Sequence, residues 1–243
     1  MNVPKVVLLT IACGVVLGGL VVRSARTSVN SVQNQELPPL EKRLEWFASR
    51  AKAKGQTKVS LPAPHTEYLG SSASTTLDKA LSVYTAVIAI PTFEKSYVVN
   101  SEDIETWVRF NIVDVVSKAD SPACPGCDVP QPPEEFSKVN DNEFVMARTG
   151  GAVTIDGVNV EMKDPQFPDF QVGKKYLLFI SRYPSGAALI GIGPGGILSV
   201  GDEGKLKGFS ERLHPVRTEI EEGLNGSLPN VKGRARSLGL SQR

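Results

Sequence analysis

Residues 149–181 constrain the fold more than any other part of the sequence. They contain two short runs with β-branched residues, 152–155 and 158–160, on either side of Asp156-Gly157. This dipeptide is the strongest short-range signal for a β-hairpin, because a type I′ turn needs positive φ at both central residues. A proline-broken connection then leads to a near-continuous apolar run at 176–181. The stretch therefore predicts a two-stranded ribbon, a loop and a fully buried strand.

Other segments carry the same kind of signal. Residues 83–90 form a near-continuous apolar run, and apolar and polar residues alternate along 105–116, which is the period of a strand with one buried face. Shorter strands are predicted at 97–99, 144–148, 187–192 and 197–200. Together these segments predict a mainly β domain, a small Greek-key barrel of five to six strands.

The composition suits this fold and excludes some functions. The 243 residues are enough for one domain with extensions, and the 41% hydrophobic content is enough for a core. The 22 glycines and 17 prolines favour a turn-rich β fold. The formal net charge of +1 gives no global attraction to nucleic acid, so no nucleic-acid partner is expected.

The N-terminal residues 1–28 are expected to form a signal-anchor or a signal peptide. Their apolar run, 6–22, is flanked by basic residues, as in a secretory signal, and is close to the lower limit of about 17 residues for a spanning helix. Cleavage after Ser24 would leave Arg23 inside the cleavage site, which disfavours processing. We therefore expect an apolar N-terminal helix that holds an exported protein to the membrane, in the bacterial periplasm or at the cell surface. A cleaved leader would instead release a secreted protein.

The rest of the chain divides into three parts. Residues 29–74 are expected to be a linker that contains an amphipathic helix at 38–55, with apolar residues at helical spacing. These residues are Leu40, Leu44, Phe47 and Ala51. Residues 75–204 are expected to form the barrel, and the helical period returns in a C-terminal tail, 205–243.

Cys124-Pro125-Gly126-Cys127 is the one local motif with reactive potential. A redox-active first cysteine normally lies at a helix N-terminus, but here prolines and aspartates flank the pair, and nearby carboxylates raise a thiol pKa. A zinc site needs two more ligands, and the sequence has no second cysteine pair and no paired histidines. The motif therefore predicts a disulfide between Cys124 and Cys127, with redox activity and half a metal site as the alternatives. No metal and no cofactor are expected.

One of the two glycine-rich stretches in the sequence has the spacing of a nucleotide-binding loop. Residues 191–196 fit the spacing of the dinucleotide motif, but a predicted strand follows them where that motif requires a helix. These glycines are therefore expected to turn a hairpin. Gly150-Gly151 is expected to form a bulge or a strand corner.

Catalytic constellations are not evident in the sequence. The two histidines, His65 and His214, lie in a linker and beside a proline, and neither belongs to a hydrolase motif. No catalytic residue is therefore predicted. Trp107 and Arg109 point to the same side of the alternating strand. They either line an exposed binding face or are covered by a helix.

Three segments carry a resemblance to a known family. These segments are 84–89, 107–112 and 170–179. In their order they are similar to an oligonucleotide/oligosaccharide-binding (OB) barrel and, more narrowly, to the netrin-like domain of tissue inhibitors of metalloproteinases, a layout also found in uncharacterised exported bacterial proteins. The resemblance implies an OB-like barrel with flanking helices. Those inhibitors act through an N-terminal cysteine held by disulfides, and no such arrangement precedes Tyr84, so no inhibitory residue carries over.

The sequence thus favours an exported, membrane-tethered binding module without catalytic activity, whose partner is an envelope or extracellular protein or a glycan. Two alternatives stay open. One is a thiol-disulfide oxidoreductase that uses Cys124 and Cys127. The other is a structural component of an envelope assembly that uses the helix at 38–55.

Overall fold

The computed structural model describes residues 42–63, 75–100, 102–119 and 131–240. The chain divides into two compact units, 1–36 and 37–243, and every described residue lies in the second. The apolar run at 6–22, His65 and the Cys124–Cys127 motif lie outside the described residues, so the predictions made for them stay predictions. Within the described ranges, no helix is both long and apolar enough to cross a bilayer.

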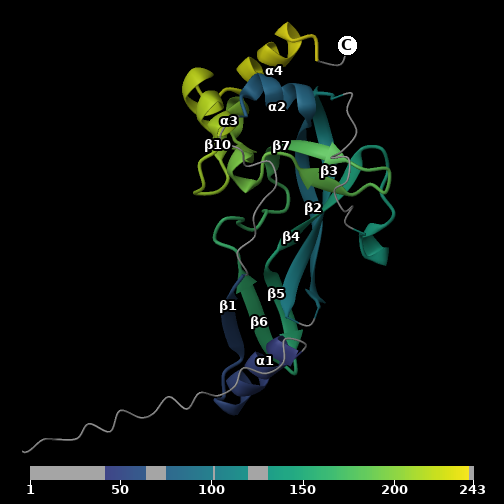
Figure 1. Cartoon of the computed structure of the whole chain (residues 1–243), viewed down its shortest axis with the longest axis vertical. Helices are drawn as coiled ribbons and strands as arrows, with labels where there is room; N and C mark the ends of the chain where they lie inside the picture. The colour runs from purple at the N-terminus through teal and green to yellow at the C-terminus, as the bar shows by residue number, and fades with distance from the viewer. Residues whose placement is uncertain (1–41, 64–74, 101, 120–130, 241–243) are drawn as a thin grey trace, which may run out of the picture. The chain divides into compact units, whose positions relative to one another are not determined.

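A seven-stranded sheet forms the larger part of the fold (Figure 1). Its strands follow the order β10-β9-β7-β2-β3-β4, and β8 pairs with β7. Their bounds are Thr85–Val99 (β2), Asp103–Ser117 (β3), Glu143–Thr149 (β4), Lys175–Arg182 (β7), Ala188–Ile190 (β8), Leu198–Val200 (β9) and Leu206–Gly208 (β10). The sheet therefore extends past residue 204, where the sequence placed the start of the helical tail.

The hairpin of β2 and β3 is longer than the sequence predicts. Two separate strands were expected before residue 100, yet β2 runs unbroken for 15 residues through Pro91. Shifts in the pairing register with β3 occur on both sides of this proline, between Ile88 and Ala89 and between Pro91 and Phe93. Such bulges let a strand absorb a residue that cannot donate to the ladder.

A second sheet of three strands stands beside the first, with the order β1-β6-β5. It consists of Lys58–Pro62 (β1), Gly151–Ile155 (β5) and Val158–Lys163 (β6). Asp156 and Gly157 have φ of 50° and 82°, so the predicted hairpin is confirmed. The sequence assigned 58–62 to a linker, but these residues pair in parallel with β6.

The mainly β class is confirmed, whereas the expected closed barrel is wrong. The described strands form open sheets, and the larger sheet ends at β4 and at β10. One isolated bridge, between Val145 and Ala187, links β4 to the segment before β8. The chain does not continue around a barrel after β4, because it turns at Gly150 and Gly151 and enters the smaller sheet.

Side chains pack on both faces of the larger sheet. On one face, Val87 and Leu178 join an aromatic group that includes Phe110, Phe144 and Phe170. The opposite face packs against helices that lie together at one end of the sheet (Figure 1). These are Leu77–Val83 (α2), Pro215–Thr218 (α3), the π-helix Glu219–Gly223 (η5) and Leu228–Ser237 (α4).

The smaller sheet has its own helix and core. The helix α1 spans Arg43–Ala53, within the helix that the sequence predicts at 38–55. Its buried residues Leu44, Ala48 and Ala51 contact a cluster built on Val160 and Met162 of β6.

The segment after β8 differs from expectation in one respect. The predicted strands at 187–192 and 197–200 exist as β8 and β9, but they do not pair with each other. Both pair with β7, β8 at Ile180–Arg182 and β9 at Lys175–Leu177. The glycines between them form a short 3-10 turn, Pro194–Gly196 (η3), rather than a hairpin.

Candidate functional site

The corner between β4 and β5 depends on two glycines. Gly150 has φ of +92° and Gly151 has φ of +134°, values that other residues rarely adopt. A Cβ on Gly151 would lie 2.1 Å from Thr106 Oγ1, and one on Gly150 would lie 2.8 Å from the carbonyl oxygen of Met162. Of the two arrangements predicted for these glycines, a bulge or a strand corner, the structure has the corner, because β4 and β5 belong to different sheets.

Hydroxyl groups hold this corner against the long hairpin. Thr106 Oγ1 donates to the carbonyl oxygen of Gly150 at 2.6 Å, and it lies 2.8 Å from Ser96 Oγ. Ser96 Oγ in turn accepts a hydrogen bond from the backbone N–H of Ala152 at 3.3 Å. β2, β3 and the start of β5 are thus tied together at one point.

A pocket of about 640 Å³ opens at this corner. Its walls come from β2, β3, β4, β5 and β6 and from the connection that follows β6. Pro165, Phe167 and Pro168 supply apolar surface, while charged side chains supply the rest. The charged residues are Glu94, Lys95, Arg148, Glu161, Lys163, Asp164 and Asp169.

Arg148 is the most deeply buried charge in this pocket. Its side chain is 4% exposed, and its Nη2 donates to Oδ1 of Asp169, a carboxylate that is 75% exposed. Its Nε–H is buried and has no acceptor among the described residues. A buried N–H without an acceptor is costly, so an additional acceptor for this donor would stabilise the folded protein.

Glu94 lines the same pocket. Desolvation by neighbouring atoms raises the pKa of its carboxyl group, the positive charge of Arg148 opposes that shift, and the negative charge of Asp169 adds to it. The carboxyl group of Glu161 behaves in the opposite way. Its hydrogen bond from Lys58, at 2.9 Å, is the main cause that lowers its pKa.

The lining carries both signs of charge. Three cationic and four anionic side chains line the pocket, so its net charge does not attract anions in general. Recognition of an anionic group would depend on the directed donors of Arg148. The guanidinium fork suits carboxylate, phosphate and sulfate oxygens, which accept in its plane.

Trp107 and Arg109, the two binding residues suggested by the sequence, lie under a short 3-10 helix, Glu134–Phe136 (η2). Trp107 is 3% exposed, and its ring centroid lies 6.2 Å from that of Phe136. Arg109 Nη2 donates to the carbonyl oxygen of Glu135 at 2.8 Å. The structure thus places both side chains under a helix, the second of the two arrangements expected from the sequence. Their binding role stays a prediction.

Arg109 also has a buried Nε–H without an acceptor among the described residues. Its guanidinium carbon lies 5.9 Å from the ring centroid of Phe136, over a neighbouring aromatic side chain. Arg148 differs because it lines a pocket with room for a ligand.

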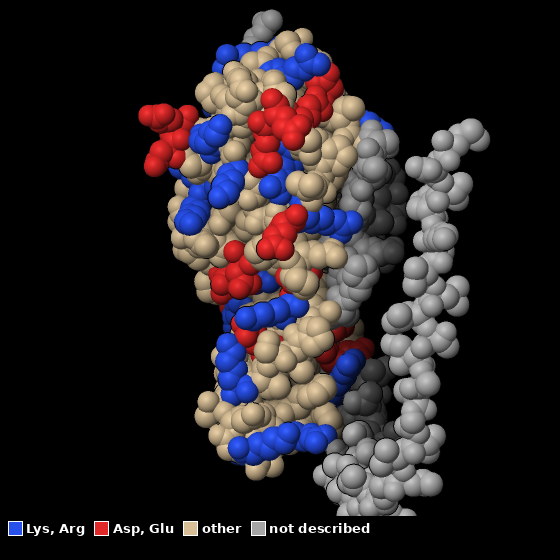
Figure 2. Space-filling model, turned by 90° about the vertical axis from the view of Figure 1, so that its left-hand side faces the viewer, with Lys and Arg blue, Asp and Glu red and all other residues tan. Residues whose placement is uncertain are grey.

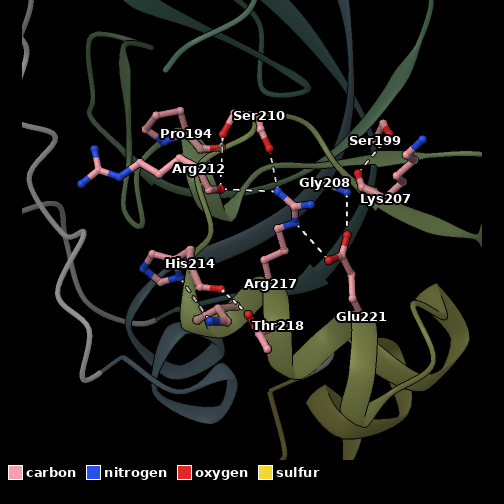
Figure 3. Close-up of polar contacts among 11 residues, drawn as sticks. Pro194, Ser199, Lys207, Gly208, Ser210, Arg212, His214, Arg217, Thr218 and Glu221 are labelled. Atoms are coloured by element: carbon pink, nitrogen blue, oxygen red, sulfur yellow. Dashed lines mark hydrogen bonds and ion pairs between the residues drawn. The ribbon is translucent and has the colours of Figure 1, made fainter. Parts of the chain in front are cut away.

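A second polar cluster contains a serine, a histidine and a carboxylate, the residue types of a hydrolase triad (Figure 3). Their geometry is different from a triad. The hydroxyl of Ser210 is directed at the carbonyl oxygens of Pro194 and Arg212, at 3.4 and 3.5 Å. His214 Nδ1 accepts from the backbone N–H of Val216 at 3.2 Å and so caps α3.

Arg217 and Glu221 complete this cluster as structural links. Arg217 Nη1 donates to the carbonyl oxygen of Ser210 at 2.6 Å, and Arg217 Nε donates to Glu221 at 3.1 Å. Glu221 also accepts from the backbone N–H of Gly208 at 2.8 Å (Figure 3). The cluster therefore fastens α3 and η5 to β10.

Sequence reasoning missed the three residues that define the pocket, Glu94, Arg148 and Asp169. Only Arg148 left a signal in the sequence: it lies near the end of an apolar strand, two residues before the Gly150-Gly151 corner. A charged residue at the end of a buried strand, next to a backbone corner, is a candidate for a buried functional group.

Comparisons of the chain with known protein families, with curated proteins and with solved structures found no match in any of the three.

Proposed function

We propose that this protein is a non-catalytic binding module that takes an oxyanion-bearing group into the pocket at Arg148. The observation that carries the proposal is the buried Nε–H of Arg148, which lacks an acceptor among the described residues and belongs to a side chain that lines a pocket of about 640 Å³. An incoming oxygen would satisfy this donor.

The rest of the pocket supports a small ligand, or a single projecting group of a larger one. Phe167 and its neighbouring prolines offer an apolar wall for the uncharged part of the ligand. Asp169 already accepts from Nη2 and fixes the plane of the guanidinium, which reduces the freedom lost on binding. Preorganisation by Asp169 and the open donor of Arg148 are the features of a recognition site.

The wider setting is proposed from the sequence. Residues 6–22 tether the protein to a membrane after export, and its ligand belongs to an envelope or extracellular protein or glycan. The OB-like and netrin-like resemblance agrees with a binding role, but it names no ligand. The Ser210 cluster supports a non-catalytic role, because its hydroxyl and imidazole groups are engaged with the backbone.

The test is a titration followed through the arginine side chains. The ¹⁵N-labelled protein is titrated with acetate, glucuronate, phosphate and sulfate while the arginine Nε–H signals are recorded. We expect at least one of these oxyanions to shift the Arg148 signal saturably and to move it towards the position of a charge-assisted hydrogen bond. The Arg148→Lys variant identifies that signal and should lose the binding.

Arg182→Lys provides the matched control. Arg182 donates to the backbone oxygens of Asp141 and Asn140, at 2.7 and 3.0 Å, and does not line the Arg148 pocket. Its replacement should leave the titration unchanged. If none of the four oxyanions shifts the Arg148 signal, or if Arg182→Lys abolishes the shift equally well, the proposal is wrong.

A further inference from the structure

The helix α1 buries one face and presents a different chemistry on the other. Leu44, Ala48 and Ala51 are buried against β6. Trp46 and Phe47 are half-buried, and neither belongs to a buried cluster of the described residues. Two large aromatic rings of an 11-residue helix are thus only partly covered by the described residues.

The two rings form a group with a cation. The ring centroids of Trp46 and Phe47 lie 4.9 Å apart in an edge-to-face arrangement. The guanidinium carbon of Arg50 lies 4.7 Å from the centroid of Trp46. A tryptophan with an arginine above it combines apolar area with positive charge, which is the composition of residues that sit at a membrane–water interface.

Basic residues surround this group. Between residues 42 and 54 the chain has five cationic side chains and one carboxylate, that of Glu45. The cationic residues are Lys42, Arg43, Arg50, Lys52 and Lys54. Figure 2 shows basic side chains along the end of the molecule that carries α1, while the other surfaces in that view mix both signs of charge. This local excess contrasts with the formal net charge of +1 for the whole chain.

We propose that α1 docks on the surface of an anionic lipid bilayer through Trp46, Phe47 and the surrounding lysines and arginines. The choice of an anionic bilayer as the partner follows from the charge of the residues around α1 and from the position of α1 in the chain. Anionic headgroups complement the basic residues, and the aromatic rings suit the headgroup layer. The chain reaches α1 shortly after the apolar run at 6–22, so the proposal rests on the membrane tether of the proposed function, whereas it is independent of the Arg148 pocket.

The chain offers two tryptophans as reporters, Trp46 and Trp107, and Trp107 is buried. The full-length protein is mixed with vesicles of brominated phosphatidylglycerol or brominated phosphatidylcholine, whose bromines quench a tryptophan in contact with lipid. The contribution of Trp46 is the difference between the natural protein and Trp46→Phe. In the Trp107→Phe variant, Trp46 is the only tryptophan, so the emission of Trp46 is measured directly.

We expect brominated phosphatidylglycerol to reduce the emission of Trp46 at least twofold more than brominated phosphatidylcholine does, and 1 M salt to remove this preference. The emission of Trp107 should not respond to either lipid. Equal quenching of Trp46 by the two lipids, or no quenching, would overturn the proposal.

A matched pair of charge variants separates docking from tethering. Arg43→Gln with Lys54→Gln removes one charge from α1 and one from its C-cap. Lys79→Gln with Lys174→Gln removes two exposed charges elsewhere. The first pair should lose the preference of Trp46 for the anionic lipid, and the second pair should keep it. Sedimentation with the vesicles reports the tether: a protein that sediments while Trp46 stays unquenched retains the tether and refutes the docking.

Discussion

Arg148 and Asp169 form an unequal ion pair, in which a guanidinium that is 4% exposed is bound by a carboxylate that is 75% exposed. Water cannot reach the guanidinium of Arg148, so the carboxylate of Asp169 is what offsets the free-energy cost of burying its charge. Asp169, by contrast, would remain solvated without its partner. The two halves of the pair therefore respond differently to replacement.

Loss of the carboxylate should cost stability. We expect Asp169→Asn to lower the free energy of unfolding by about 1–3 kcal/mol, because a buried charge loses its charged partner. Urea unfolding measures the change. Asp202→Asn, at an exposed position in the 3-10 turn Asp202–Gly204 (η4), is the control and should change stability by less than about 0.5 kcal/mol. Equal effects of the two variants would contradict the dependence of Arg148 on Asp169.

The glycine corner gives a second stability prediction. Gly151→Ala should destabilise the fold by more than about 2 kcal/mol, because it combines positive φ with a clash against Thr106. Gly173→Ala is a matched control: it has φ of +84°, but no atom lies within 4 Å of its added Cβ. Gly173→Ala should lower the free energy of unfolding by about 1 kcal/mol. Thermal unfolding of both variants compares the clash with backbone strain alone.

Glu94 predicts a pH dependence of stability. Because desolvation raises its pKa in the folded protein, the folded state holds this proton more tightly than the unfolded state does. The ionised carboxyl group is therefore unfavourable to the fold above its folded pKa, and this penalty disappears as the pH falls through the raised pKa towards the unfolded value. Because Glu94 is exposed, solvent keeps this effect small. Glu94→Gln should be slightly more stable than the natural protein at pH 7 and equal to it near pH 3. If the stability difference between Glu94→Gln and the natural protein grew on acidification, the predicted direction of the pH dependence would be wrong.

The same carboxyl group should affect ligand binding. Sulfate keeps its charge over this pH range, whereas Glu94 becomes neutral as the pH falls. The affinity of the Arg148 pocket for sulfate should therefore rise on acidification, because a negative charge beside the site is removed. In Glu94→Gln this rise should be smaller, and the affinity at pH 7 should be higher than in the natural protein. A titration at several pH values, followed by the Arg148 Nε–H signal, measures both effects.

The surface ion pair of Asp78 and Arg234 should contribute less to stability than the pair of Arg148 and Asp169. Arg234 Nε donates to Asp78 at 2.6 Å, and the hydrogen bonds from this arginine are the main cause that lowers the pKa of Asp78. The stabilisation is present above the unfolded pKa of an aspartate and is lost as the pH falls through the lowered value. Because both side chains are exposed and screened by water, a double-mutant cycle of Asp78→Asn and Arg234→Gln should give only a small coupling free energy, which rising salt reduces further.

Local signals in the sequence were sufficient for part of the fold. The hairpin at Asp156-Gly157 was predictable because its turn is determined by two adjacent residues. The path of β2 through Pro91 was not, because it depends on register shifts against a strand whose residues lie further along the chain. The prediction of a closed barrel was wrong for a similar reason. β6 pairs with β1, which lies about 100 residues earlier in the chain, and this pairing places β6 outside the larger sheet.

The candidate site depends even more on distant residues. Glu94, Arg148 and Asp169 come from three separate segments, and no spacing rule relates them. Glu94 and Arg148 lie on β2 and β4, which flank β3 in the larger sheet, and the chain after the corner at Gly150 and Gly151 adds Asp169 to the same pocket. The sequence indicated the corner, but not what would gather around it.

The parallel pairing of β1 with β6 also has a mechanical consequence. Five residues of β1 pair with β6 side by side. A pull on β1 directed along the strand would load these five residue pairs together, rather than open them one after another. The smaller sheet would then resist a force applied along β1 before that force reached the corner at Arg148.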